Sequence, residues 1–198
     1  MEKGLLYETV VSTVNSNQTA NAAPIGIICK DNNTVVCYLH QGSSTVRNIK
    51  RNKKFIVNLL KDPMVFVEST LGNLSENYYA SHKDEFYIKS TDAFFLANVI
   101  SMKDVERADQ FGVSVTSVVV ADVSDIFKQK ECVEPLNRAI YGIVEGLVYL
   151  TRMEMVSGEM EKLYRHRMGE INRIVNKVGG KEHKNAMKKI SEAFSKYD

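Results

Sequence analysis

Residues 41–58 have the sequence QGSSTVRNIKRNKKFIVN, in which a glycine and three consecutive hydroxyl residues precede a polar, basic segment. The residues on either side of this segment, 35–40 and 55–60, form apolar runs rich in β-branched and aromatic types, which fit a pleated sheet. We therefore predict two strands, joined by a turn and a short helix over residues 46–52. The rest of the chain is interpreted around this connection.

The hydroxyl residues Ser43, Ser44 and Thr45 lie where the short helix is expected to begin. A helix start leaves backbone N–H groups unpaired and carries a partial positive charge, so it favours a phosphate. Serine is also a common helix cap where no ligand binds. The turn alone therefore leaves two interpretations open, an anion site or an ordinary capped connection.

Alternating patterns predict further strands on both sides of this turn. Before it, residues 5–13 and 22–29 are strand-like, and residues 30–34 are expected to form a hairpin turn. Pro24 has no N–H to donate, so we expect it at the mouth or edge of its strand. After the turn, the predicted elements are strands over residues 85–89, 94–102 and 113–123, with a charged surface loop over residues 103–112. In that loop Phe111 is either a lid aromatic or a buried anchor.

From residue 134 the apolar pattern takes the period of a helix. Helices are predicted over residues 135–153, 159–178 and 182–197, and the second is expected to stop at two glycines. The apolar stripes expected to be buried are, in chain order, Leu136, Ile140, Ile143, Leu147 and Leu150; then Met160, Leu163, Tyr164, Met168, Ile171, Ile174 and Val175; then Met187, Ile190 and Phe194. Strands followed by helices give an α+β class with a mainly β core, and six or more antiparallel strands favour a barrel or a sandwich.

Three charged residues, Arg138, Glu145 and Arg152, recur every seven positions on another face of the first of these helices. One interpretation is a solvated ion-pair face, which stabilises a helix by only a few tenths of a kcal/mol per pair. The other is a contact with a ligand or a subunit. The pattern does not separate the two.

Composition and charge describe an ordinary globular protein. The chain has 198 residues, 44% hydrophobic, and a formal net charge of +2, which argues against nucleic acid or an anionic membrane as the main partner. There is no apolar run of about 18 to 20 residues and no signal-peptide pattern at the N-terminus, so we expect a cytoplasmic protein. Cys29 and Cys37 are expected on one strand face as packed core thiols, with metal binding as the alternative.

The sequence contains no familiar hydrolase, metalloprotease, nucleotide-hydrolysis or Rossmann motif. Its four histidines lie on unrelated predicted elements, and none has an obvious orienting partner. We therefore nominate no catalytic residue and no metal ligand. Two loops remain as site candidates, the hydroxyl turn and residues 21–24, which a hairpin is expected to bring to the same edge of the sheet.

The order of these motifs resembles the FMN-binding split-barrel, or flavin reductase-like, superfamily. The matching runs are Asn-Ala-Ala-Pro-Ile-Gly at residues 21–26, Ser-Thr-Val-Arg-Asn-Ile at residues 44–49 and Phe-Ile-Val-Asn at residues 55–58. Within that superfamily the chain most resembles an uncharacterised, mainly archaeal family, domain of unknown function 447. The resemblance implies a split β-barrel domain over residues 1–130 and a C-terminal helical section over residues 131–198 packed on it.

The resemblance also implies a cofactor, FMN, bound near the interface of a homodimer. The phosphate is then expected on the hydroxyl turn and the isoalloxazine near residues 22–24. The implied cofactor-binding residues are Asn21, Ala22, Ala23, Pro24, His40, Gln41, Ser43, Ser44, Thr45, Arg47, Asn48 and Asn58. Arg47 can make a charge-assisted pair with a phosphate.

Two functions follow from the resemblance. The first is an FMN-dependent oxidoreductase or electron-transfer protein of unknown substrate, with a nicotinamide or a deazaflavin as the electron donor. The second is a carrier or sensor that binds a flavin or a deazaflavin without turnover. Whether the protein is an enzyme is left open by the sequence.

Overall fold

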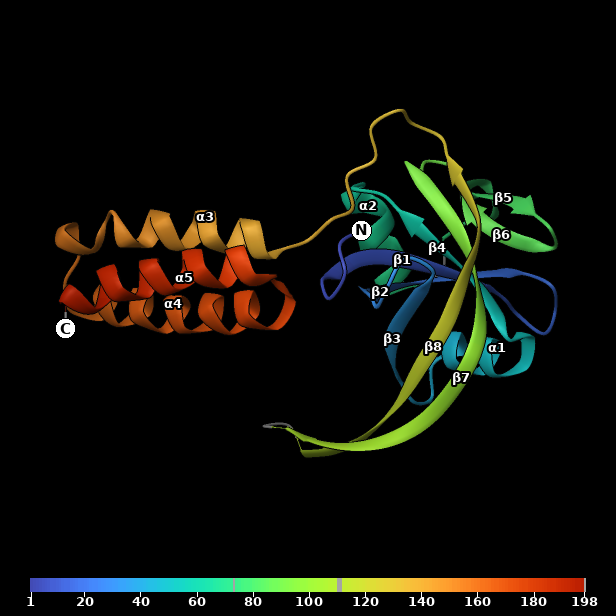
Figure 1. Ribbon diagram of the computed structural model, residues 1–198, viewed down its shortest axis with the longest axis horizontal. Helices are drawn as coiled ribbons and strands as arrows, with labels where there is room; N and C mark the ends of the chain where they lie inside the picture. The colour runs from blue at the N-terminus through green and yellow to red at the C-terminus, as the bar shows by residue number, and fades with distance from the viewer. Residues whose placement is uncertain (73, 110–111, 198) are drawn as a thin grey trace. The chain divides into compact units, whose positions relative to one another are not determined.

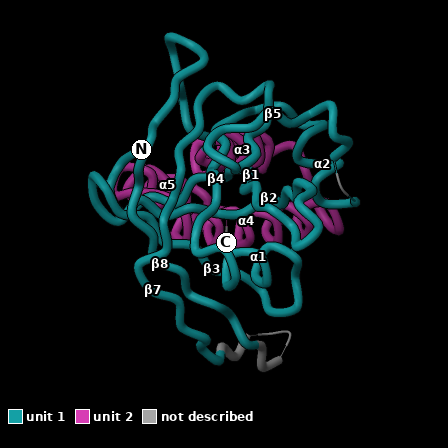
Figure 2. The backbone as a smooth tube through the Cα atoms, turned by 90° about the vertical axis from the view of Figure 1, so that its right-hand side faces the viewer, with its two compact units in different colours: residues 1–136 teal, residues 137–198 magenta. Residues whose placement is uncertain are grey.

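The computed structural model describes residues 1–72, 74–109 and 112–197. The chain forms two compact units, residues 1–136 and residues 137–198 (Figure 2). The strands of the first unit are β1 Leu6–Val14, β2 Ala20–Cys29, β3 Thr34–His40, β4 Lys54–Leu59, β5 Tyr79–His82, β6 Glu85–Ile88, β7 Ala93–Asp109 and β8 Gly112–Lys128 (Figure 1). Its helices are α1 Ser44–Asn52 and α2 Pro63–Leu71. The second unit contains α3 Ala139–Leu150, α4 Glu159–Val178 and α5 Lys181–Phe194. Short 3-10 turns lie at Glu76–Tyr78, Met153–Met155 and Ser195–Tyr197.

Six strands close into an antiparallel barrel in the order β1-β2-β3-β8-β7-β4, which confirms the predicted barrel and the α+β class. In the β2–β3 hairpin Ile27 pairs with Cys37, so Cys29 and Cys37 are diagonal neighbours on one face, as predicted. Both thiols are buried, and burial raises the pKa of Cys37 to about 12. Among the described residues no group of three or more His, Cys, Asp or Glu could hold a metal ion.

The barrel interior is an apolar core built from alternate residues of every barrel strand. Phe55 of β4 is fully buried there, and Val46 and Ile49 of α1 pack into the same core. The short helix of the predicted turn therefore belongs to the barrel and is not a loose connection. Outside the barrel a second apolar cluster joins β1 and β2 to α2, β5 and β6.

The hairpin of β7 and β8 is much longer than the sequence predicted. Residues 103–109 were expected in a charged loop, but they extend β7, with Lys103 paired to Val118 and Val105 paired to Thr116. The prediction was wrong because a two-stranded ribbon beyond the barrel exposes much of its surface, so charged residues do not prevent a strand there. Two register shifts in β7 accompany the curvature seen in Figure 1. Phe111 lies outside the described residues.

In the helical unit α3 lies against α4 and α5. The predicted core of the third helix is confirmed, since Met187, Ile190 and Phe194 are all buried. The predicted stripe of the first helix is wrong at Ile140 and Leu147, which are 49% and 43% exposed.

Small residues on the opposite face of α3 explain why Ile140 and Leu147 are exposed. The buried residues of α3 are Ala139, Ile143 and Gly146, and at Gly142 an added Cβ would lie 3.3 Å from a methyl carbon of Val175, which is tighter than an ordinary contact. Small side chains let helices approach closely, so the small face turns inward although the opposite face is more apolar. On α4 the predicted core residues Met160 and Leu163 are likewise exposed. Of the helices in the described ranges, none is both long and apolar enough to cross a membrane.

Candidate functional site

The two barrel strands β2 and β3 are paired over only part of their length. The two strands pair only where Ile27–Cys29 faces Val35–Cys37, although β2 begins seven residues earlier, at Ala20. Within the described chain, residues 20–26 therefore have a strand partner on one side only, which is β1. Unpaired backbone groups at such an edge are available to a ligand or to a second chain.

The hydroxyl turn begins α1 as predicted. Ser43 is the N-cap, and its hydroxyl accepts a hydrogen bond from the N–H of Val46 at 3.2 Å. The backbone N–H groups of Ser44 and Thr45 have no acceptor within the part of the chain that the structure describes. The first turn of α1 contains no acidic residue, and Gly42, with φ +84°, leaves open space where a side chain would be. The first turn of α1 therefore supplies no carboxylate of its own that would compete for these N–H groups.

Arg47 holds a positive charge over the same turn. Its guanidinium donates to the carbonyl of Gly42 at 2.5 Å and to the hydroxyl of Ser44 at 2.9 Å. The side chain is exposed. Since a guanidinium has five N–H donors, these two bonds leave others that can reach an anion at the helix start.

A buried polar cluster lies beneath the turn. Asn21 donates to the hydroxyls of Thr13 and Thr45, each at 3.2 Å, which confirms that the two candidate loops lie together. Asn48 donates to Thr13 at 3.0 Å and to Asn15 at 2.8 Å. These side chains therefore fix α1 to the ends of β1 and β2. Sequence reasoning did not single out Thr13 and Asn15, because polar residues at the end of a strand are common in turns.

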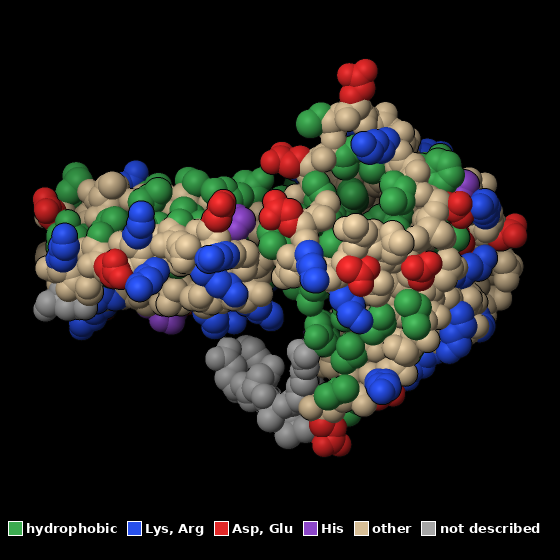
Figure 3. Space-filling view, in the orientation of Figure 1, with side chains coloured by type: hydrophobic (Ala, Val, Ile, Leu, Met, Phe, Trp, Pro, Cys, Tyr) green, Lys and Arg blue, Asp and Glu red, His purple; other side chains and the backbone are tan. Residues whose placement is uncertain are grey.

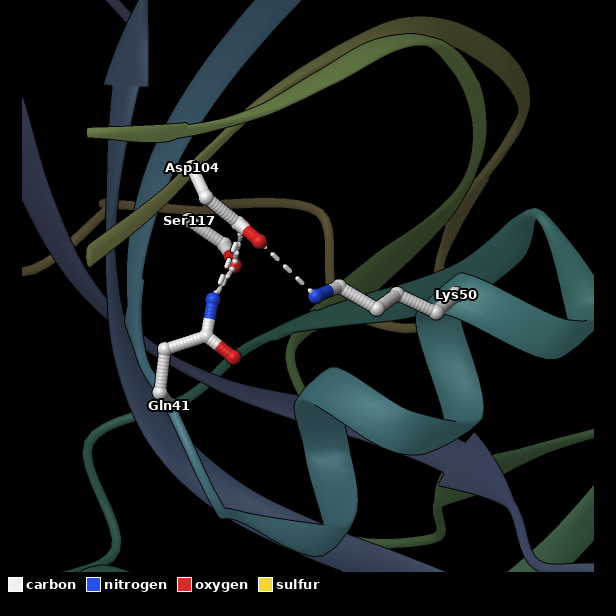
Figure 4. A network of polar contacts seen from close by, with 4 residues as sticks. All are labelled: Gln41, Lys50, Asp104 and Ser117. Carbon is white, nitrogen blue, oxygen red and sulfur yellow. Dashed lines mark hydrogen bonds and ion pairs between the residues drawn. The ribbon is translucent and has the colours of Figure 1, made fainter. Parts of the chain in front are cut away.

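Gln41 belongs to a network that joins the turn to the long hairpin (Figure 4). Its side-chain amide donates to a carboxylate oxygen of Asp104 at 2.8 Å and to the hydroxyl of Ser117 at 2.6 Å. Lys50 of α1 pairs with the other carboxylate oxygen of Asp104 at 3.1 Å. The hydrogen bond from Ser117, followed by that from Lys50, lowers the pKa of Asp104 below its ordinary value. The sequence could not reveal this contact, because Asp104 was assigned to a loop.

We expect Asp104→Ala to loosen the hairpin near the turn. Removal of the carboxylate leaves Lys50 and Gln41 without their shared acceptor, so amides of residues 103–106 and 115–118 should exchange hydrogen faster. Because the pKa of Asp104 is lowered in the folded state, the network is complete at neutral pH and is lost only as pH falls through that lowered value. Hydrogen exchange read by mass spectrometry measures the effect. Glu106→Gln, which changes another exposed carboxylate of β7, is the control; equal exchange in both variants would contradict the role given to Asp104.

The remaining candidate residues divide between the surface and the barrel wall. Ala23 and Pro24 are half-buried at the open edge of β2, and the side chain of His40 is exposed beside the turn. Ala22 is buried in the outer apolar cluster, where its side chain packs away from the turn. Asn58 is fully buried in β4 and lies two strands away from Pro24, with Val10 of β1 between them.

Asn58 has partners on three sides within the protein. Its amide donates to the carbonyl of Val10 at 2.9 Å and to the hydroxyl of Ser12 at 3.0 Å. Its carbonyl accepts from the N–H of Ile88 at 2.8 Å. The structure thus brings together Asn21, Gln41, Ser43, Ser44, Thr45, Arg47 and Asn48, and it leaves Asn58 in the wall.

Family comparison agrees with this architecture. Residues 7–122 match the model described as the N-terminal domain of a protein of unknown function (DUF447), and residues 137–192 match a second model of that name. The chain belongs to the DUF447 family. The two matched ranges fall in the barrel unit and the helical unit.

Relatives of this DUF447 protein include the uncharacterized protein MJ1453 of Methanocaldococcus jannaschii. That protein is 30% identical over 183 residues, which cover 90% of this chain and 93% of MJ1453. The crystal structure of FMN-bound protein MM1853 from Methanosarcina mazei, also of the DUF447 family, is 28% identical with a TM-score of 0.51, covering 97% of this chain and 96% of that one. The flavin reductase HpaC, solved with NADP+, is 18% identical with a TM-score of 0.52, over 68% of this chain and 86% of HpaC. The HpaC likeness concerns the fold alone, and the fold is a split barrel of the flavin reductase type.

Proposed function

We propose that this protein is a flavoprotein that binds FMN, with the phosphate at the start of α1. The observation that carries the proposal is the pair of free backbone N–H groups at Ser44 and Thr45. The hydroxyls of Ser43 and Ser44 and the guanidinium of Arg47 surround them. A phosphate with about −1.5 to −2 charges suits this set of donors. The FMN-bound relative from the same family supports the choice of ligand.

The ring of the flavin is proposed to lie along the open edge of β2, near Ala23 and Pro24. Small side chains at this edge let a flat ring approach the backbone closely. Edge groups of β2 that have no strand partner can then hydrogen-bond the polar rim of the ring. The other face of the ring is left for a second copy of the chain, so we propose a homodimer.

We propose an oxidoreductase or electron-transfer role. FMN supplies hydride or electron transfer when it is bound, and the protein supplies binding, orientation and electrostatics. The proposed electron donor is a nicotinamide or a deazaflavin. Turnover of NADH, NADPH or a reduced deazaflavin would separate an oxidoreductase from a carrier that only holds the flavin.

Titration with FMN tests the binding proposal. We expect cofactor-free protein to take up one FMN per chain, with quenched flavin fluorescence, and to bind riboflavin much more weakly because riboflavin lacks the phosphate. Protein that stays colourless during the titration would overturn the proposal. Equal affinity for FMN and riboflavin would overturn the assignment of the phosphate to α1.

A further inference from the structure

The chain around α1 is strongly basic. Residues 32–61 contain no Asp or Glu, and their Lys and Arg residues are Arg47, Lys50, Arg51, Lys53, Lys54 and Lys61. Figure 3 shows Lys and Arg side chains gathered on the part of the barrel unit where α1 lies in Figure 1. Three of these cations, Lys50, Lys54 and Lys61, pair with carboxylates of the same unit. Arg47, Arg51 and Lys53 have no carboxylate partner among the described residues, so α1 keeps an excess of positive charge.

Arg51 is held in place by neutral oxygen atoms. Its Nη2 donates to the carbonyl of Val14 at 2.7 Å and to the side-chain oxygen of Asn48 at 3.2 Å. Its Nε donates to the side-chain oxygen of Asn52 at 3.0 Å. The side chain is exposed, and its Nη1 donates to no acceptor in the part of the chain that the structure describes. The fold therefore orients this guanidinium, while its charge and one of its nitrogens stay available to an anion.

Arg47 and Arg51 lie on one exposed stripe of α1, which begins with Ser44 at the helix start. Four residues are close to one helical turn, so the Cβ atoms of the two arginines are about 6 Å apart. Like charges at this spacing repel each other. Arg47 is also disfavoured by the helix dipole, because its guanidinium folds back to Gly42 at the positive end of the helix. An anionic ligand along this stripe would relieve both effects.

We propose that Arg51 binds a second phosphate group, one helical turn from the phosphate bound at the start of α1. This inference rests on the proposed function, which places the first phosphate there. FMN has a single phosphate, so the second belongs to a dinucleotide. That dinucleotide is either FAD, whose second phosphate adjoins the first, or a phosphorylated nicotinamide that binds beside FMN as the electron donor. Both offer the same chemistry, a phosphate oxygen that accepts a charge-assisted hydrogen bond from Nη1 of Arg51.

Titration of the Arg51→Gln variant of the full chain tests the inference in two arms. In the first arm, FMN and FAD are each titrated into cofactor-free protein, and flavin fluorescence is measured. In the second arm, NADP+ is titrated into FMN-loaded protein and followed by calorimetry, since NADP+ does not reduce the flavin. Lys53→Gln is the matched control, because Lys53 is also exposed and its loss changes the net charge equally.

We expect Arg51→Gln to weaken the binding of FAD or of NADP+ by at least about tenfold, as the loss of one charge-assisted hydrogen bond implies. Its affinity for FMN should stay within about threefold of the parent protein, which shows that the fold and the first phosphate site are intact. Lys53→Gln should change each affinity by less than about threefold. A loss with FAD assigns the second phosphate to the flavin, and a loss with NADP+ assigns it to the electron donor.

Three results would overturn the role of Arg51. The first is a parent protein that binds FMN but neither FAD nor NADP+, and the second is an Arg51→Gln variant that matches Lys53→Gln in both arms. The third is an equal loss for FMN and for the dinucleotide, which would assign Arg51 to the first phosphate. Failure of the parent protein to bind FMN would instead overturn the proposed function, so the two failures are distinguished.

Discussion

Ser44→Glu is expected to lower the affinity for FMN by at least about 100-fold. The new carboxylate lies in the first turn of α1, where it occupies the free N–H groups and pairs with Arg47, which already bonds Ser44. Loss of two charge-assisted hydrogen bonds to a phosphate, at about 1.5–3 kcal/mol each, corresponds to this change in affinity. Isothermal calorimetry or flavin fluorescence measures it.

The fold should survive this substitution, because an acidic residue in the first turn of a helix is favourable. Ser44→Gln, which has nearly the same shape without the charge, is the control and should bind FMN within about tenfold of the parent protein. Riboflavin affinity should be unchanged in both variants. A Ser44→Glu protein that retains full affinity for FMN would place the phosphate elsewhere.

Asn58→Ala is expected to destabilise the barrel by about 3 kcal/mol. The substitution leaves the carbonyl of Val10 and the N–H of Ile88 without their partner in a fully buried part of the wall. Each buried polar group that loses its hydrogen bond costs about 1–3 kcal/mol. Urea denaturation followed by circular dichroism should show a lower midpoint.

The matched control for the Asn58→Ala variant is the Asn98→Ala variant. Asn98 is exposed on β7 and makes one hydrogen bond to Ser124 at 3.0 Å, so its loss should change stability by less than about 0.5 kcal/mol. Below the unfolding transition Asn58→Ala should bind FMN as the parent protein does. If Asn58→Ala instead lost much of its affinity for FMN without losing stability, Asn58 would have to be assigned to the flavin-binding site.

Local sequence was sufficient where a residue's partner is near in the chain or where periodicity marks one face. The hairpin register that places Cys29 diagonal to Cys37 follows from the length of the turn, and α4 begins and ends at the predicted residues 159 and 178. The cap at Ser43 is also local, since its hydroxyl bonds Val46 three residues later.

Local sequence failed where packing partners decide which surface is buried. The stripe through Ile140 and Leu147 has the right period for a core, yet Gly146 and Ala139 are buried because close helix packing favours small residues. Residues 103–109 looked like a loop because their charges suggested exposure, and exposure is equally compatible with a ribbon that extends beyond the barrel.

The sequence by itself determined a run of antiparallel strands that form a barrel or a sandwich, a helical C-terminal section, and a hydroxyl-rich helix start suited to an anion. These features depend on alternation, helical period and capping, which are properties of neighbouring residues. Only the tertiary structure decided that Asn21 reaches Thr45, that Asp104 holds Gln41 and Lys50, and that Asn58 is engaged within the wall. Those contacts join residues 24 to 63 positions apart, and which distant strands come together is set by closure of the barrel. The helix start thus became a candidate phosphate site through the fold around it, and that site is what Ser44→Glu tests.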